Sequence, residues 1–189
     1  MASAGLEFDV EPSDVDESLE GRFEPEAAAL ILARRKAEAV ALLHLGEDVW
    51  VLGSDTVVAL GEGSSLELLG KPEDALDARR MLEALSDSRH RVVTGVCVVR
   101  CLDWDPKEPE KGLFDGFERT WVSMREISEA EIAAYVDSEE WCGKAGGYAI
   151  QENADAFVTR LEEGSFDNVV GLPVSLTLEL LRNSGSFTG

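Results

Sequence analysis

The sequence predicts an α/β fold in one domain covering residues 1–189, and three observations indicate it. Strand-like runs rich in Val, such as Arg91 to Leu102, alternate with segments of helix-forming residues. Helix-start signals precede those segments; Ser128 and Glu131, for example, have the spacing of a capping box. A chain of 189 residues is also long enough to bury one hydrophobic core. We therefore expect strands and helices to share a single core.

Helices are predicted where Ala, Leu, Arg and Glu follow a start signal, and prolines suit the first turn of three of them. The predicted ranges are Pro25 to His44, Pro72 to about Leu85, Ser128 to about Val136, and Pro173 to about Asn183.

Strands are predicted where apolar or alternating runs lie between turn residues. They are Leu6 to Val10, a buried strand within Asp48 to Leu60, Arg91 to Leu102, Phe117 to Ile127, Ala156 to Leu161, and Val169 to Val170. Glu11 to Phe23 is expected to form an acidic loop, Gly61 to Ser65 a turn, and Cys101 to Gly116 a long hairpin connection.

The charge balance excludes some classes of partner. The chain has 38 acidic residues against 17 Lys and Arg, which gives a formal net charge of −21. Binding to nucleic acid requires a basic surface, and so does docking on anionic membranes. Neither partner is therefore expected, although a small anion can still bind in a local basic pocket.

The cysteines and histidines are too few and too far apart for several kinds of site. Cys97, Cys101 and Cys142 do not form a disulfide framework, and Cys97 is expected to be a buried apolar residue. His44 and His90 lack the spacing of metal ligands. The sequence has no apolar run long enough to span a membrane and no pattern of a signal peptide, so a cytoplasmic location is expected.

Two short patterns are candidates for chemistry. Gly53-Ser54-Asp55-Thr56 places a carboxylate and hydroxyls at what we expect to be the end of a buried strand, where open α/β sheets bind ligands. Lys71 comes directly before a predicted helix start and can meet an anion there. Taken alone, the first pattern is more typical of a turn that carries an Asp, and the second of a surface lysine in a loop.

Three further patterns are weaker. Lys144 to Gln151 contains a glycine pair that allows close backbone approach, and Tyr148 and Gln151 can stack on a base and read its edge. Gly164 to Pro173 is interpreted as structural, and the acidic run Asp14 to Glu17 as either a solvated loop or a group of metal ligands.

Together and in this order, the segments resemble the Maf family of nucleoside triphosphate pyrophosphatases. The resemblance extends from Gly5 to Leu181. It is carried by GLEFDVEPSDVDE, ILARRKAEAV, VLGSDTVVAL, GKPEDALDARRMLEALSDSRHRVVTGV, YVDSEEWCGKAGGYAIQ and GSFDNVVGLPVSLTLELL.

The resemblance implies a fold and an activity. The fold is an elongated mixed sheet flanked by helices, with two lobes around a central cleft, similar to the ITPase-like fold. Family members hydrolyse nucleoside triphosphates to the monophosphate and pyrophosphate with a divalent metal, Mg²⁺ or Mn²⁺. Ser-Asp-Thr together with Gly-Tyr-Ala-Ile-Gln looks like the branch that acts on dTTP and UTP. Members are often dimers, so a homodimer is included in the expectation.

The resemblance also implies roles for single residues. Asp55 matches the catalytic acid that activates water, and Glu17 an acidic residue near the metal, so both are expected at the metal. Lys36 and Lys71 match cations that bind the phosphates. Thr56 and Gln151 match positions linked to the choice of base.

One part of the family pattern has no counterpart in this sequence. Family members begin with a strand and a Ser-x-Ser-Pro-Arg-Arg loop that leads into a helix, whereas here Gly5 follows the first four residues directly. The arginines of that loop normally contact phosphate. This difference motivates a second reading, a weak or inactive relative that acts by binding nucleotide or a partner, as in the inhibition of septum formation associated with the family.

Overall fold

A five-stranded antiparallel sheet forms the centre of the protein, in the order β2-β1-β3-β4-β5. The computed structural model describes residues 7–186. The strands are β1 (Trp50–Leu60), β2 (Glu67–Leu69), β3 (Arg89–Arg100), β4 (Leu113–Met124) and β5 (Val158–Glu162). The α/β class is confirmed, but all four pairings are antiparallel where a mixed sheet was expected. The reason is the connections, since hairpins such as the one between β3 and β4 reverse the chain.

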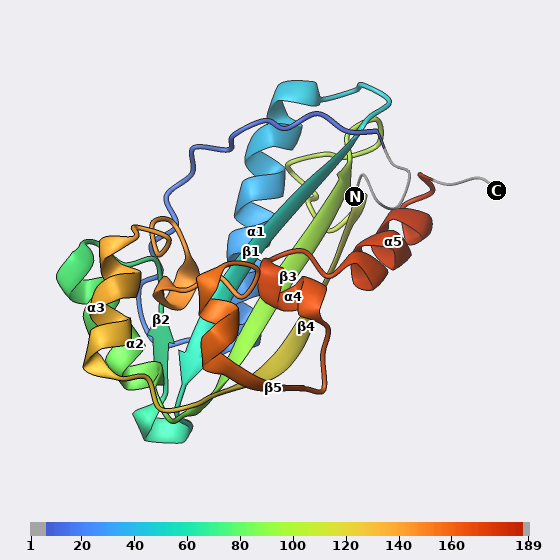
Figure 1. Ribbon diagram of the computed structural model, residues 1–189. Helices are drawn as coiled ribbons and strands as arrows, with labels where there is room; N and C mark the ends of the chain where they lie inside the picture. Colours follow the sequence, from blue (N-terminus) through green and yellow to red (C-terminus); the bar gives the residue numbers. More distant parts are fainter. Residues whose placement is uncertain (1–6, 187–189) are drawn as a thin grey trace.

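Helices cover both faces of the sheet and lie at both of its ends (Figure 1). They are α1 (Pro25–Ala41), α2 (Ala75–Leu85), α3 (Glu129–Asp137), α4 (Phe166–Val170) and α5 (Val174–Asn183). Helix α1 packs on one face, against β1 and β3, and α4 and α5 pack on the other. Helices α2 and α3 pack together at one end, and α5 lies at the other. None of the helices within residues 7–186 is long and apolar enough to cross a membrane.

Most predicted elements are present, with shifted ends. Helix α2 begins at Ala75 rather than Pro72, because the Asp74 side chain caps it by accepting from the Asp77 amide. The capping box at Ser128 is confirmed at the start of α3. Strand β4 begins before Phe117, so the hairpin connection is shorter than expected.

Two predicted strands are wrong. Residues 7–10 have no regular structure, and Leu6 lies outside the described residues. Val169 and Val170 belong to helix α4, not to a strand. The Ser165 side chain caps this helix by accepting from the Asn168 amide, and Gly171 ends it in the left-handed conformation at φ 113°. These two caps outweigh the strand preference of a pair of valines.

Very small residues let α1 lie unusually close to the sheet. A Cβ atom on Gly95 would lie 2.4 Å from the carbonyl oxygen of Ala29, and one on Gly53 would lie 2.4 Å from that of Ala33. Because Gly95 is the cross-strand partner of Asp55, this close approach brings α1 directly over the middle of β1. The helix therefore presents Lys36 to that carboxylate.

Candidate active site

Asp55 lies in the middle of β1, which corrects the expectation that it ends a strand. The neighbouring part of β1 is nevertheless accessible at its edge, because β2 pairs only with residues 58–60 and no other described strand pairs on that side. Successive side chains of a strand point to opposite faces. Asp55 therefore faces α1, and Thr56 faces α4, across a single open edge.

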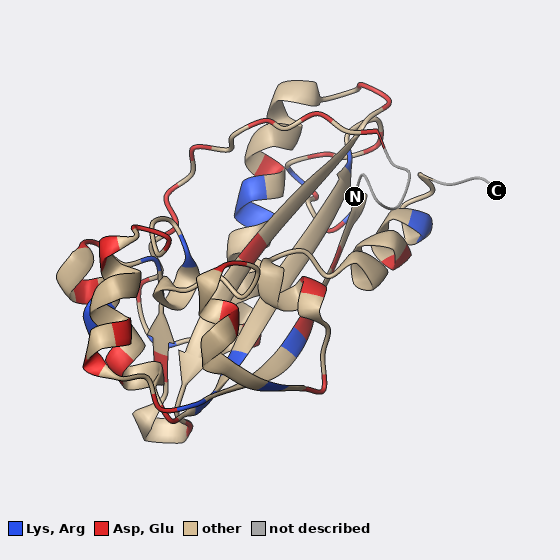
Figure 2. Ribbon diagram, viewed as in Figure 1, with Lys and Arg blue, Asp and Glu red and all other residues tan. Residues whose placement is uncertain are grey.

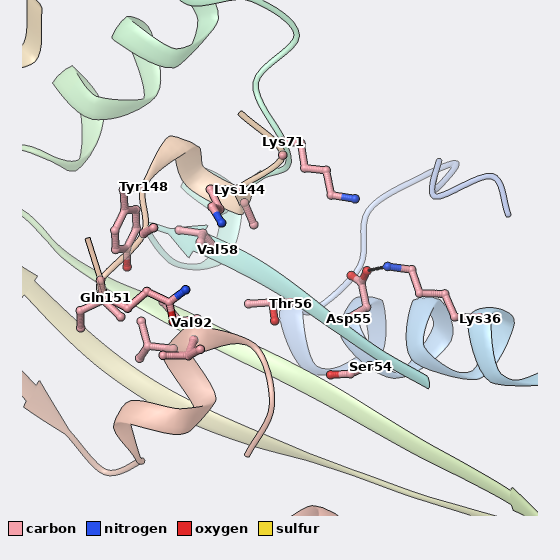
Figure 3. A pocket seen from close by; sticks show the side chains of 16 residues that line it. Lys36, Ser54, Asp55, Thr56, Val58, Lys71, Val92, Lys144, Tyr148 and Gln151 are labelled. Carbon is pink, nitrogen blue, oxygen red and sulfur yellow. Dashed lines mark hydrogen bonds and ion pairs between the residues drawn. The ribbon is translucent and has the colours of Figure 1, made fainter. Parts of the chain in front are cut away.

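A pocket of about 280 Å³ lies beside this edge (Figure 3). Its lining comes from α1, β1, β3, the loop before α2, the segment 143–151 and α4: Lys36, Ser54, Asp55, Thr56, Val58, Lys71, Val92, Gly143, Lys144, Ala145, Tyr148, Ala149, Ile150, Gln151, Val169 and Val170. Five of the six predicted site residues, Lys36, Asp55, Thr56, Lys71 and Gln151, therefore share one pocket. Elements distant in sequence, from residue 36 to residue 170, meet here.

Glu17, the sixth predicted residue, is joined to the pocket by two lysines. Lys36 Nζ lies 2.8 Å from Glu17 Oε1 and 2.5 Å from Asp55 Oδ1. Lys71 Nζ lies 2.5 Å from Glu17 Oε2. The run of interactions Asp55–Lys36–Glu17–Lys71 thus alternates in charge, and its formal sum is zero.

The segment that carries Glu17 is extended, and hydrogen bonds hold it in place. The Ser18 amide donates to Asp16 Oδ1 at 2.8 Å, which fixes the backbone on either side of Glu17. Arg35 Nη1 donates to the carbonyl oxygen of Ser18 at 3.0 Å. Arg35 and Lys36 are adjacent on α1, so one turn of this helix fixes both the backbone and the carboxylate of the Glu17 segment.

The pKa values in this cluster follow from burial and from the lysines. Burial raises the pKa of Asp55, which is 8% exposed, and the hydrogen bond from Lys36 opposes that rise. Burial also acts to raise the pKa of Glu17, but hydrogen bonds from Lys36 and Lys71 outweigh it and lower that pKa. For Lys36, burial acts to lower the pKa and the two carboxylates raise it. Lys36 therefore stays charged and helps to keep Asp55 ionised.

The surrounding surface differs in charge from this cluster. Figure 2 shows acidic residues along the N-terminal segment and on α2 and α3, and basic residues on α1. A polyanion approaching the pocket thus meets a protein of net charge −21, and only the local cations attract it.

The donor set at Asp55 fits a divalent cation that is shared with a phosphate. Within residues 7–186, no group of three His, Cys, Asp or Glu side chains is arranged to hold a metal by itself. Mg²⁺, however, is usually held by one or two carboxylates together with substrate phosphates and water. Both oxygens of Glu17 accept from lysines, whereas Asp55 Oδ2 accepts no hydrogen bond from any described residue. Asp55 Oδ2 is therefore the free carboxylate oxygen for such an ion.

The other end of the pocket is mostly apolar and suits a flat ring. Val58, Val92 and Tyr148 lie at this end together with the Lys144 side chain, and Gln151 is exposed at its rim (Figure 3). This end lies on the α4 side of the sheet, where Thr56 points. The carboxylate of Asp55 thus lies at one end of the pocket and the valines at the other, where Lys144 adds one cation.

The glycine pair of this region approaches protein rather than open space. Gly146 and Gly147 have φ angles of 69° and 70°, which favour glycine. A Cβ on Gly146 would lie 3.0 Å from Val58, and one on Gly147 would lie 3.1 Å from Pro72. The Gly146 amide also donates to the carbonyl oxygen of Gly70 at 2.9 Å. The glycines therefore fix the loop that carries Lys71.

Sequence reasoning missed two buried polar residues behind the pocket. His90 is fully buried, and its Nε2 lies 2.8 Å from the Tyr148 hydroxyl oxygen. Thr94 is also fully buried and contacts the Thr56 hydroxyl. The available signal was alternation along β3, which places His90, Val92 and Thr94 on the same face as the pocket.

The fold and the site define a class of protein. It is an α/β protein in which one pocket joins the lysine–carboxylate cluster to an apolar slot, the end of the pocket that contains Val58, Val92 and Tyr148. Such a pocket suits a small phosphorylated molecule that carries a ring. Comparison with known proteins gives the family. The family described as Maf-like protein matches residues 1–184. The chain belongs to this family.

Curated relatives agree with that assignment. A protein of Rhodospirillum rubrum named dTTP/UTP pyrophosphatase is 44% identical over 186 residues, which cover 98% of this chain and 81% of the relative. A protein of the same name from Anaeromyxobacter dehalogenans is 45% identical over 185 residues, covering 98% and 87%. Another from Geotalea uraniireducens is 41% identical over 186 residues, covering 98% and 89%.

Proposed function

We propose that this protein hydrolyses nucleoside triphosphates, dTTP and UTP above all, to the nucleoside monophosphate and pyrophosphate. The observation that carries the proposal is the single pocket in which the Asp55–Lys36–Glu17–Lys71 cluster adjoins an apolar slot. The names of the relatives support the same activity and the same pair of substrates.

In the proposed reaction, water attacks a phosphorus atom of the α–β anhydride. A new bond forms from the water oxygen to phosphorus, the bond from that phosphorus to the bridging oxygen breaks, and the water proton passes to a base. Asp55 is that base: it is buried, it lines the pocket, and burial raises its pKa toward the range useful for accepting a proton. Lys36 holds the carboxylate in place through its hydrogen bond.

The phosphates bind at Lys36 and Lys71. Both ammonium groups now contact Glu17, so a triphosphate competes with that carboxylate for the same donors. Because the cluster has no net charge, the lysines alone do not neutralise the substrate. A divalent cation supplies the missing positive charge, and Asp55, with Glu17 once the latter is displaced from its lysines, would hold it.

The base occupies the apolar slot on the α4 side of β1. Val58, Val92 and Ile150 enclose its ring, while Thr56 and Gln151 supply hydrogen bonds to its edge. The nucleotide then passes around the open edge of β1, with its base on one side and its phosphates on the other. The cytoplasmic location and the homodimer remain predictions from the sequence.

The test is pyrophosphate release from dTTP, UTP, CTP, GTP and 7-methyl-GTP, with Mg²⁺ or Mn²⁺ and without metal. Asp55→Asn removes the base with little change in volume, and we expect turnover to fall by at least about a hundredfold. Asp103→Asn, in the exposed hairpin after β3, is the matched control and keeps wild-type turnover.

The outcomes separate the two readings of the sequence. Metal-dependent turnover of dTTP and UTP that is lost only in Asp55→Asn supports the enzyme. Nucleotide binding in calorimetry without pyrophosphate release, from folded protein, would instead support a relative that acts by binding alone. Equal turnover of the wild type and Asp55→Asn would refute the role of Asp55.

A further inference from the structure

A short chain of hydroxyl groups runs from the pocket into the core. Thr56 Oγ1 lies 2.9 Å from Thr94 Oγ1, and Thr94 Oγ1 lies 2.8 Å from the carbonyl oxygen of Asn168. Thr56 lines the pocket, whereas Thr94 and Asn168 are fully buried. The chain therefore connects β1, β3 and α4 behind the slot proposed for the base.

The directions of these two hydrogen bonds follow from the number of hydrogens available. A hydroxyl oxygen and a carbonyl oxygen at 2.8 Å need a hydrogen between them, and only Thr94 can supply it. Each threonine hydroxyl has a single hydrogen, so Thr94 has none left for Thr56. Thr56 must therefore donate to Thr94, and only the lone pairs of its oxygen are left to interact with the pocket.

Two neighbouring features keep this arrangement in place. The Asn168 side-chain nitrogen donates to the Val92 carbonyl oxygen at 3.1 Å and to Thr120 Oγ1 at 2.9 Å, which ties α4 to β3 and β4. A Cβ on Gly171 would lie 3.3 Å from Thr56 Oγ1, so the glycine leaves that oxygen uncovered. The carbonyl oxygen that receives the Thr94 hydrogen is thus fixed, and the Thr56 oxygen stays accessible.

We propose that Thr94 is a positioning residue for base selection, which makes Thr56 a hydrogen-bond acceptor toward the nucleotide. The inference deepens the function proposed above and rests on it. Uracil and thymine both carry a hydrogen on ring nitrogen N3, whereas N3 of cytosine is an acceptor. When Thr56 can only accept a hydrogen bond, it binds the N3 hydrogen of uracil or thymine and repels the lone pair on N3 of cytosine. The hydrogen-bond relay from Thr56 through Thr94 to the Asn168 carbonyl oxygen thereby favours UTP and dTTP over CTP and dCTP.

Removing the Thr94 hydroxyl should weaken this preference. In Thr94→Val the Thr56 hydrogen loses its buried acceptor and is free to turn into the pocket, where it can serve cytosine N3. UTP and CTP have the same sugar and similar ring size, so the ratio of their kcat/KM values isolates the base edge. We expect that ratio to fall by roughly tenfold or more in Thr94→Val.

Two further variants, Thr94→Ser and Thr56→Val, show whether a changed ratio comes from the lost hydrogen bond or from a packing defect. Thr94→Ser keeps the hydroxyl and should keep the wild-type ratio, even where the lost methyl group lowers stability. In a Thr56→Val background the ratio is already reduced, and adding Thr94→Val should change it no further. A packing defect alone would lower the turnover of UTP and CTP together and leave the ratio unchanged.

Several results would overturn the proposal. They are a wild type without preference for UTP over CTP, a ratio that survives in Thr94→Val, or a ratio lost equally in Thr94→Ser. The ratio of UTP and CTP dissociation constants, measured by calorimetry on the same variants, tests the relay independently of catalysis. Failure of the proposed hydrolysis would appear as absent turnover of UTP by the wild type, whichever way the binding ratio responds.

Discussion

The buried His90 should make the stability of this protein fall steeply in mild acid. Burial lowers the pKa of His90 from 6.5 to about 4 in the folded protein, while the unfolded chain keeps the ordinary value. Between these two pKa values the unfolded state binds a proton that the folded state does not. Stability due to this residue is therefore fully present above pH 6.5 and is lost as the pH falls toward 4.

The size of the effect follows from those two pKa values. Proton linkage for a single group with pKa values of 6.5 and about 4 gives a loss of roughly 2 kcal/mol between pH 7 and pH 5. That is a large part of a typical free energy of unfolding of about 5–15 kcal/mol. In the folded protein His90 stays mostly neutral at pH 5, so its hydrogen bond with the Tyr148 hydroxyl at the wall of the pocket is retained there.

The assay is urea unfolding at pH 7 and pH 5, with His90→Phe/Tyr148→Phe as the comparison. This pair of changes removes the titrating group and its hydrogen-bond partner together, so no buried polar atom of the pair is left alone. Other titrating groups contribute equally to both proteins and cancel. We expect the wild type to lose about 2 kcal/mol more than the variant; equal losses would refute the reasoning.

Two other perturbations test the site and the packing that builds it. Lys71→Met should raise KM for UTP by about tenfold or more, because a phosphate contact is lost. Thermal stability should stay nearly unchanged, since Lys71 is exposed. Lys111→Met, at an exposed lysine in the hairpin loop, is the charge-matched control. Gly95→Ala should lower the free energy of unfolding by about 1–3 kcal/mol, because its Cβ would lie 2.4 Å from the Ala29 carbonyl oxygen. Gly70→Ala, where no atom lies within 4 Å of the added Cβ, should change stability little, and urea unfolding compares the two.

Local signals were enough to predict most of the fold. The apolar runs gave β1 and β3, and the capping box gave the start of α3. Strand β2 was missed because its three residues are too few to show a pattern. Helix α4 was misread because valines favour strands locally, whereas the Ser165 cap and Gly171 decide the conformation.

The candidate site was predictable only in part. The resemblance identified Asp55, Lys36, Lys71, Thr56 and Gln151, and the structure brings them together in one pocket. Nothing local could show that Glu17 bridges both lysines, because the three residues are far apart in sequence and meet only through the packing of α1 on the sheet. The direction of the Thr56 hydrogen bond depends on α4, which sequence reasoning had interpreted as structural only.

The most direct test of the central claim is the identity of the products formed from UTP. The wild type, incubated with UTP and Mg²⁺ or Mn²⁺, should give UMP and pyrophosphate in equal amounts, with no UDP at any time. Chromatography of the nucleotides and an assay for pyrophosphate on the same samples give both numbers. UDP with inorganic phosphate, or intact UTP from folded protein, would contradict the account.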